Sequence, residues 1–256
     1  MNQTNQRIIG LEEEYFSTFC IREDEGILTR YSDNQMVEMH SHNFTWVKEP
    51  LTQDELKDLI GKELERRKDK GFHFLKLRLD WVLEADSLMN YDKKSVTNIE
   101  YYRIEPDSVA AIKSREDIEV IKLSDLMVDE ARELDELCEE GDSLEFTKKR
   151  FDRRLEIYLK DQGPDNYLAL LEWDAVGACD FFAQKNTCML EDFVVDPEYR
   201  NQGIGTALLK ILAEKAFSEG NDLVFIRADA RETAREMYQK LGFQKLMETT
   251  EITFKF

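Results

Sequence analysis

A glycine-containing stretch, Arg-Asn-Gln-Gly-Ile-Gly at residues 200–205, follows an apolar strand pattern at Phe193–Val195 and leads into a helical pattern from Ile204. Glycine has no Cβ and tolerates positive φ, so the backbone of such a loop can approach a ligand closely. The first four amides of a helix lack intrahelical acceptors, and the helix dipole makes that end partly positive. The sequence therefore predicts an α/β fold in which the amides of residues 202–206 cradle a phosphate or diphosphate, with Arg200 adding a charge-assisted bond.

Two absent features narrow the kind of loop. No lysine follows Gly205, as the P-loop pattern requires, and the third glycine of the dinucleotide-binding pattern is missing. The stretch instead resembles the Arg/Gln-x-x-Gly-x-Gly/Ala loop of the GNAT superfamily, the acetyl-CoA-dependent N-acetyltransferases. Residues 190–199 resemble the strand and turn before that loop, and Ala234–Phe243 resembles the last helix of the family, with Tyr238 and the closing Gly-Phe in place.

Residues 115–256 show an alternation of strand and helix patterns that resembles the GNAT layout. The predicted elements are, in order, a strand at 118–123, helices at 126–140 and 143–161, strands at 167–173, 176–184 and 188–195, a helix from 204 that ends at Gly220, a strand at 223–228, a helix capped by Asp229 with Glu232, and a closing strand at 251–256. The predicted fold class is α/β (α+β), a GNAT-like mixed sheet flanked by helices, in a domain that covers residues 115–256.

Residues 1–114 are predicted to form a smaller α/β domain. A charged helix at 51–70 is accompanied by strand patterns at 27–31, 36–47, 72–79 and 99–104. The strand-helix-strand succession at 36–79 fits a degenerate second copy of the GNAT-like half, and it fits an unrelated α/β extension equally well. Lys48-Glu49-Pro50 stands where the copy would carry its glycine loop, so we predict that this part does not bind acetyl-CoA.

The composition disfavours several classes of protein. A net charge of −19 works against nucleic acid or anionic membrane as partners and suits a cationic one. Residues 1–9 lack the basic and apolar segments of a signal peptide, and no apolar run is long enough to cross a bilayer, so we expect a cytoplasmic protein. The four cysteines form no C-x-x-C pattern, and His40 and His42, which would share a face of the predicted strand, lack a third ligand at matching spacing. We therefore expect reduced thiols and no metal.

The resemblance also implies which residues carry the chemistry. Amide formation needs a neutral amine, whereas an alkylammonium has a pKa of about 10.4, so a base must accept its proton. By resemblance this base is Glu191 or Asp192, acting directly or through water. Neighbouring strand residues point to opposite faces, so one of the two is expected to face the site, and Glu191 is favoured. Tyr238 is the expected acid for the departing CoA thiolate, and an ordinary core aromatic is the alternative for it.

Coenzyme binding is assigned by resemblance to a strand and a loop. In GNAT enzymes the strand before the loop bulges away from its neighbour, and its backbone binds the acetyl and pantetheine groups. Many relatives have an asparagine near the start of the last helix that bonds the coenzyme; here Arg231 stands in that region, where arginine can instead meet a phosphate. The predicted acetyl-CoA-binding residues are Phe193, Val194, Val195, Arg200, Asn201, Gln202, Gly203, Ile204, Gly205, Thr206 and Arg231.

We therefore expect direct transfer of an acetyl group from acetyl-CoA to a primary amine in a ternary complex. A small cationic amine is the favoured acceptor, and a peptide or protein amine is the alternative. A binding module that senses or holds acyl-CoA without turnover is the alternative from another class. The choice of acceptor is expected to lie in residues 139–146 and in the closing strands. A monomer or homodimer is expected, with no nucleic-acid or membrane partner.

Overall fold

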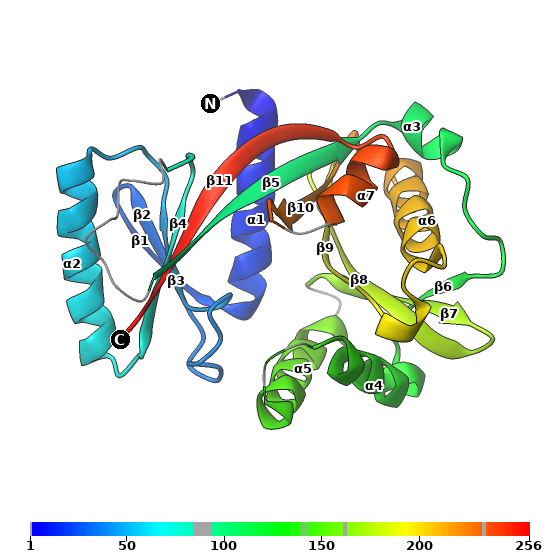
Figure 1. The fold of residues 1–256 in the computed structure, drawn as a ribbon, viewed down its shortest axis with the longest axis horizontal. Coiled ribbons are helices and arrows are strands. Elements are labelled where there is room, and N and C mark those ends of the chain that lie inside the picture. Colours follow the sequence, from blue (N-terminus) through cyan, green and yellow to red (C-terminus); the bar gives the residue numbers. More distant parts are fainter. Residues whose placement is uncertain (1, 84–93, 140, 142, 161–162, 232–233) are drawn as a thin grey trace. The chain divides into compact units, whose positions relative to one another are not determined.

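The computed structural model describes residues 2–83, 94–139, 141, 143–160, 163–231 and 234–256 (Figure 1). The chain divides into two compact units that are not consecutive in sequence. The first contains Met1–Thr18, Tyr101–Arg227 and Glu236–Leu246, and the second contains Phe19–Glu100, Ala228–Arg235 and Met247–Phe256. The domain boundary predicted between residues 114 and 115 stays a prediction.

The first unit is a mixed sheet with helices on both faces. Its strand order is β5 (Lys94–Ile104, of which Tyr101–Ile104 lie in this unit), β10 (Leu223–Asp229), β9 (Thr187–Val195), β8 (Asp174–Gln184), β7 (Asp165–Leu171) and β6 (Glu119–Lys122). Strands β9 and β10 run parallel, whereas β8 is antiparallel to both β7 and β9. The predicted mixed sheet flanked by helices is confirmed.

The helices of the first unit are α1 (Gln3–Phe19), α3 (Pro106–Ala111), α4 (Val128–Cys138), α5 (Leu144–Tyr158), α6 (Ile204–Ser218) and most of α7 (Ala234–Lys240), with short 3-10 turns at Asp125–Met127 and Pro197–Tyr199. Helices α4 and α5 lie side by side (Figure 1). A Cβ added to Gly177 of β8 would meet Ile204 of α6, whereas the next residue, Ala178, faces the α4–α5 side. Because successive strand residues point to opposite faces, α6 covers one face of β8 while α4 and α5 cover the other.

The second unit is a smaller sheet that carries one complete helix among its described residues. Its strand order is β1 (Ile21–Glu25), β2 (Leu28–Ser32), β3 (Phe44–Val47), β4 (Phe74–Leu79), β11 (Gln244–Lys255) and the first part of β5. Strands β3 and β4 are parallel and are joined through α2 (Gln53–Asp69), and β11 pairs antiparallel with β4. The core is apolar and comprises Leu28, Val47, Leu56, Ile60, Leu75, Leu77, Leu79, Ile252 and Phe254.

The predicted strand at residues 36–47 is wrong over most of its length. Only Phe44–Val47 is a strand, and residues 36–43 form turns. The amide of Asn43 donates to the carbonyl oxygens of Met36 and Met39, at 2.7 and 2.9 Å, and its side-chain oxygen accepts from the backbone N–H of Asp33 at 2.9 Å. A buried asparagine thus satisfies backbone groups that a strand would pair with its neighbour.

One local prediction stays open and one helix was not predicted. The last helix, α7, is described from Ala234, and the carboxylate of Asp229 accepts bonds from the backbone and guanidinium of Arg231, so the predicted cap at Asp229 stays a prediction. Its expected partner, Glu232, lies outside the described residues. Helix α1 was not predicted, although buried Ile8, Leu11, Tyr15 and Phe19 follow a helical spacing.

Candidate acetyl-CoA and acceptor site

The glycine loop has the backbone geometry that an anion site requires. Gly203 is the residue before α6, with φ of 84°, and no side chain caps the helix there in the described residues. The first helical bond runs from the N–H of Ala207 to the carbonyl of Gly203 at 3.0 Å. The amides of the preceding turn are therefore left for a ligand, as expected for a helix N-terminus.

The second glycine has a packing role. A Cβ on Gly205 would lie 2.7 Å from Cζ of Phe193 and 3.5 Å from Cγ2 of Val195. Gly205 therefore permits α6 to approach β9 closely, which positions the loop directly after that strand. The sequence predicted this glycine for close approach to a ligand, and the structure shows close approach to a neighbouring strand.

Polar side chains of the loop bond back to the backbone around them. Arg200 Nε donates to the carbonyl of Val195 at 3.2 Å, and Gln202 Nε2 donates to the carbonyl of Glu198 at 2.8 Å. The loop also contacts Arg115, which the sequence analysis missed. Arg115 donates to the carbonyl of Gln202 at 3.1 Å and forms two bonds to Asp117, which raise its pKa. No local pattern marks Arg115, because it precedes β6 and meets the loop only through the fold.

Strand β9 is irregular where the acetyl group is expected to bind. Its pairing with β10 is recorded from Thr187 to Leu190, although β9 continues to Val195. On its other side, the register with β8 shifts by one residue after Glu191, and Asp192 has φ of 53°. This β-bulge interrupts the alternation of side chains, so the expectation that Glu191 and Asp192 point to opposite faces does not apply here.

Glu191 is held in an ion pair. Arg227 of β10 donates to both carboxylate oxygens, at 2.7 and 2.9 Å, and also to Glu12 of α1 at 3.2 Å. Burial tends to lower the pKa of Arg227, but Glu191 and Glu12 outweigh it and hold that pKa well above its usual value. Both oxygens of Glu191 are therefore engaged with a permanent cation.

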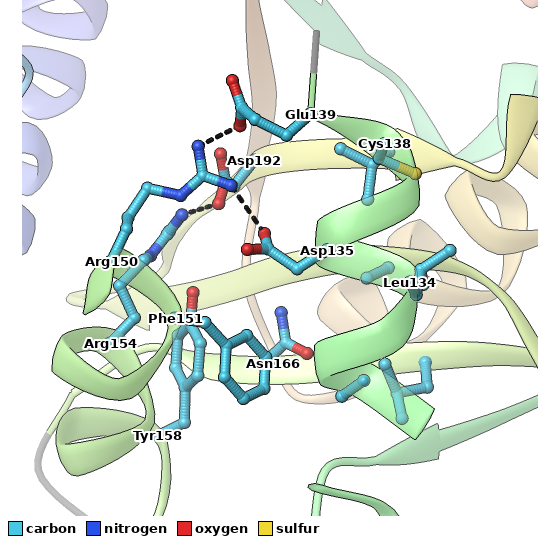
Figure 2. A pocket seen from close by; sticks show the side chains of 14 residues that line it. Leu134, Asp135, Cys138, Glu139, Arg150, Phe151, Arg154, Tyr158, Asn166 and Asp192 are labelled. Atoms are coloured by element: carbon cyan, nitrogen blue, oxygen red, sulfur yellow. Dashed lines mark hydrogen bonds and ion pairs between the residues drawn. The ribbon is translucent and has the colours of Figure 1, made fainter. Parts of the chain in front are cut away.

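Asp192 lines a pocket of about 80 Å³ in the first unit (Figure 2). The walls come from α4, α5, β7, β8 and β9, and they combine apolar groups with charged ones. The lining residues are Ala131, Leu134, Asp135, Cys138, Glu139, Arg150, Phe151, Arg154, Tyr158, Asn166, Leu168, Ala178, Asp192 and Val194. Burial raises the pKa of Cys138 to about 11, so this thiol is neutral near pH 7.

Two arginines one turn apart on α5 organise the charges of this pocket. Arg150 pairs with Asp135, at 2.8 Å, and with Glu139, both near the end of α4 (Figure 2). Arg154 pairs with Asp180 of β8, at 2.7 Å, and with Asp192. Four carboxylates thus surround two guanidinium groups, which leaves an excess of negative charge. Oδ2 of Asp135 is buried and has no hydrogen-bond partner among the described residues.

The remaining predicted residues have other surroundings. Tyr238 is 3% exposed and its ring lies against Tyr102 and Phe243, with centroid distances of 6.1 and 5.7 Å. Arg231 bonds Asp229 and Thr97 in the second unit. The side chains of Asn201, Ile204, Thr206, Phe193 and Val194 lie on the loop, on α6 or on β9, where the sequence placed them.

The two candidate histidines do not share a strand face. The ring of His40 lies tilted against Phe74, with a centroid distance of 4.0 Å, whereas the ring of buried His42 bonds Asp33 at 3.0 Å. Among the described residues, no three side chains of His, Cys, Asp or Glu are grouped so that they could hold a metal ion. Within the same part of the chain, no helix combines the length and apolar character that a membrane span requires.

Residues 128–243 match the family model described as "Acetyltransferase (GNAT) family". This part of the chain is a GNAT acetyltransferase domain. The chain is 43% identical over 60 residues to the thialysine N-epsilon-acetyltransferase of Bos taurus, and 44% identical over 55 residues to the glucosamine 6-phosphate N-acetyltransferase of Trypanosoma brucei brucei. These alignments cover 23% and 22% of this chain, and they span about a third of the relatives' own length, 35% and 36%.

Solved structures with the same fold extend over nearly the whole chain. A conserved protein of unknown function from Staphylococcus epidermidis ATCC 12228 matches with a TM-score of 0.82 and 16% identity, covering 96% of this chain and 97% of that one. A GCN5-related N-acetyltransferase from Kribbella flavida matches with a TM-score of 0.68 and 13% identity, covering 97% and 94%. A tandem GNAT protein from the clavulanic acid biosynthesis pathway matches at 0.60 and 13%, covering 89% and 78%. At these identities the likeness establishes the fold.

Proposed function

We propose that this protein transfers the acetyl group of acetyl-CoA directly to a small cationic primary amine in a ternary complex. The observation that carries the proposal is the start of α6, where Gly203 takes a positive φ and no side chain of the described residues caps the helix. An anionic diphosphate fits that position, because helix amides and the helix dipole stabilise negative charge. Arg200 and Arg115, both at this loop, add positive charge within an otherwise acidic chain.

Asp192 is the proton acceptor in this proposal, in place of Glu191. Glu191 has both oxygens engaged by Arg227, whereas Asp192 lines the pocket and its side chain is 45% exposed. Asp192 accepts the proton of the ammonium directly or through a water molecule. The neutral nitrogen then forms a bond to the acetyl carbon, the bond from that carbon to the CoA sulfur breaks, and the nitrogen releases its second proton to solvent.

Two further groups are needed for the transfer. Backbone N–H groups of Phe193–Val195, past the bulge, stabilise the negative charge that develops on the carbonyl oxygen. The departing thiolate takes a proton, and Tyr238 is the proposed donor. The ring of Tyr238 is packed against Tyr102 and Phe243, and its hydroxyl group is the proposed proton donor.

The charges of the pocket favour a cationic acceptor. Asp135, Glu139, Asp180 and Asp192 outnumber Arg150 and Arg154, and Oδ2 of Asp135, which has no partner among the described residues, can accept a hydrogen bond. An ammonium group supplies both positive charge and donors, whereas a phosphate supplies neither. Of the acceptors in the names of the two relatives, thialysine therefore fits this pocket better than glucosamine 6-phosphate. A peptide N-terminus or a lysine side chain is the alternative acceptor.

A non-catalytic acyl-CoA sensor is the second candidate. The burial of Tyr238 and the ion-paired state of Glu191 favour it, because neither side chain is free to move protons as it stands. Such a sensor would bind coenzyme A at the same loop and would release no thiol in the presence of amines.

Thiol release from acetyl-CoA, measured with a matched set of acceptors, tests the proposal. Butylamine carries one ammonium group, putrescine carries a second, ornithine adds a carboxylate to the same skeleton, and glucosamine 6-phosphate carries a phosphate. We expect transfer to putrescine with the highest kcat/KM and none to glucosamine 6-phosphate. Calorimetry with coenzyme A, run in parallel, separates the candidates: binding without thiol release for any amine or peptide would favour the sensor, and no binding would contradict both.

A further inference from the structure

Helix α1 belongs to the acetyltransferase unit although it lies outside the matched residues 128–243. Two of its polar side chains are buried: Glu12 is 0% exposed and Tyr15 is 5% exposed. Each is hydrogen-bonded to residues next to the proposed site. An isolated GNAT-type sequence pattern gives no reason to expect polar residues of a distant helix at this place.

Tyr15 contacts a buried carboxylate, Asp180 of β8. The Tyr15 hydroxyl donates to Oδ2 of Asp180 at 2.9 Å, and burial together with Asp180 raises the pKa of Tyr15, so the hydroxyl keeps its proton. Asp180 also accepts from Arg154 at 2.7 Å, Tyr158 at 3.1 Å and Asn166 at 2.9 Å. A carboxylate that is fully buried is tolerated only with such partners, so this arrangement is rigid.

Arg154 connects this arrangement to the proposed base. One of its terminal nitrogens donates to both Asp180 and the Tyr15 hydroxyl, at 2.7 and 3.1 Å, and the other pairs with Asp192. Tyr15 therefore accepts from Arg154 and donates to Asp180. This holds the guanidinium at the terminal nitrogen that does not pair with Asp192. A planar group held at several donors has one orientation, and Asp192 is paired with it in that orientation.

A second chain of hydrogen bonds from α1 holds Glu191, the residue before Asp192. Glu12 accepts from Arg227 at 3.2 Å and from the Tyr101 hydroxyl at 3.2 Å, and Arg227 in turn holds both oxygens of Glu191. The bulged backbone at Asp192 is thus held through the preceding Glu191, and its side chain is held through Arg154. Both sets of contacts lead to residues of α1, Glu12 and Tyr15.

We propose that α1 positions the proposed catalytic carboxylate, with Tyr15 acting on Asp192 through Arg154. This inference rests on the proposed acetyl transfer with Asp192 as proton acceptor. Tyr15 does not reach the reacting atoms; it sets the place and the charge state of the group that does. The acetyltransferase activity of this chain therefore depends on a helix about a hundred residues before the matched domain.

The expected pH effect has a definite sign. Arg154 stabilises the charged form of Asp192, so a less firmly held Arg154 raises the pKa of that carboxyl group and moves the acidic limb of kcat/KM to higher pH. Other charged or titratable groups around Asp192 remain in place when Tyr15 is altered. They are Arg150 and Tyr158 on α5, Asp135, Cys138 and Glu139 on α4, Asp180 on β8, and Glu191 on β9.

The test compares Tyr15→Phe with Ser17→Ala. The first variant removes the hydroxyl but keeps the ring contacts with Phe16 and Phe182, and the second removes an exposed hydroxyl of the same helix that donates to the Glu13 carbonyl. For Tyr15→Phe we expect kcat to fall roughly tenfold, a fraction of what a general base supplies, with an unchanged KM for acetyl-CoA and a shifted acidic limb. For Ser17→Ala we expect wild-type kinetics.

Asp180→Asn provides a second variant, which keeps the size of the side chain and removes the charge that anchors Arg154. It is expected to lower kcat and shift the pH profile in the same direction as Tyr15→Phe. Wild-type kcat and pH profile in Tyr15→Phe, with only a lower Tm, would overturn the inference and leave the proposed function standing. A wild-type protein that acetylates no amine would overturn the proposed function and, with it, this inference.

Discussion

The two strand-helix-strand segments of the chain, β9–α6–β10 and β3–α2–β4, share a topology and differ at the start of the helix. In each, two parallel strands are neighbours in a sheet and the helix connects them. Helix α6 begins after Gly203, which has no side chain to offer its amides. Helix α2 begins after Thr52, which forms a complete capping box with Glu55.

The difference decides which helix can take an anion. Thr52 Oγ1 accepts from the Glu55 N–H, and the Glu55 carboxylate accepts from the Thr52 N–H at 2.9 Å. The first turn of α2 also carries Asp54 and Glu55, whereas the first turn of α6 has no acidic residue. The α2 terminus is therefore satisfied by its own side chains, and the α6 terminus is not. The cap supports our prediction that residues 36–79 do not bind acetyl-CoA, and the choice between a degenerate copy and an unrelated extension stays open.

A carboxylate at the N-terminus of α6 should make this terminus resemble that of α2, and we expect it to have the largest effect on coenzyme A binding. We predict that Gly203→Asp weakens coenzyme A binding roughly 100-fold, because a negative charge meets the diphosphate and a side chain is forced to a φ of 84°. Calorimetry measures the change in Kd. Gly220→Asp is the matched control, since Gly220 has φ of 90° at the other end of the same helix. Equal loss of binding in both variants would show that strain alone is responsible.

Glycine-to-alanine substitutions inside the two helices should have opposite signs. A Cβ on Gly205 would lie 2.7 Å from Phe193, whereas a Cβ on Gly61 in α2 meets nothing within 4 Å. We predict that Gly205→Ala lowers the free energy of unfolding by about 1–3 kcal/mol and that Gly61→Ala raises it by about 0.5–1 kcal/mol. Urea titrations measure both. A stabilising Gly205→Ala would contradict the close approach of α6 to β9.

Removing the cap of α2 should affect stability and leave coenzyme binding intact. We predict that Thr52→Ala lowers the free energy of unfolding by about 1 kcal/mol, because the Glu55 amide loses its acceptor. The Kd for coenzyme A should stay at the wild-type value. Tighter or additional binding of coenzyme A in Thr52→Ala would mean that α2 retains a latent anion site, which would argue against the contrast drawn above.

The smallest expected effect is the pH dependence of that cap. Hydrogen bonds from the Thr52 side chain and backbone lower the pKa of Glu55. A carboxyl group with a lowered folded-state pKa contributes stability above its unfolded pKa, and the contribution is lost as pH falls through the folded value. The Tm difference between wild type and Glu55→Gln should therefore shrink as the pH falls below about 4. A difference that is constant from pH 7 to pH 3 would contradict a charged Glu55 in the cap.

The parts that could be read from the sequence are those set by neighbouring residues. The position of the loop follows from Gly203 and Gly205 between an apolar strand and a helical period, and the order of α4 to β10 follows from the same kind of local pattern. The resemblance to GNAT enzymes then led to the prediction that the ligand of the loop is acetyl-CoA. These features depend on backbone preferences within a few residues, which a single sequence displays.

The parts that could not be read depend on residues far apart in the chain. Tyr15 and Asp180 are 165 positions apart, and Arg115 and Gln202 are 87 positions apart. The choice between Glu191 and Asp192 as the base stays a prediction, because the side-chain alternation on which it relied is interrupted at Asp192 by a register shift against β8, and period-two alternation does not reveal such a shift. Residues 36–43 were misread because Asn43 bonds their backbone from within a turn.

The interleaved composition of the second unit has a consequence for how the chain folds. Ile252 and Phe254 on β11 complete a core whose other members lie between Leu28 and Leu79. The last six residues of β11 pair with the whole of β4. During translation, strands β1 to β4 leave the ribosome first, and β11 leaves it only after the whole acetyltransferase segment has been made. Until then the edge of β4 is unpaired, so the nascent chain has a long interval in which chaperones or other strands can bind that edge.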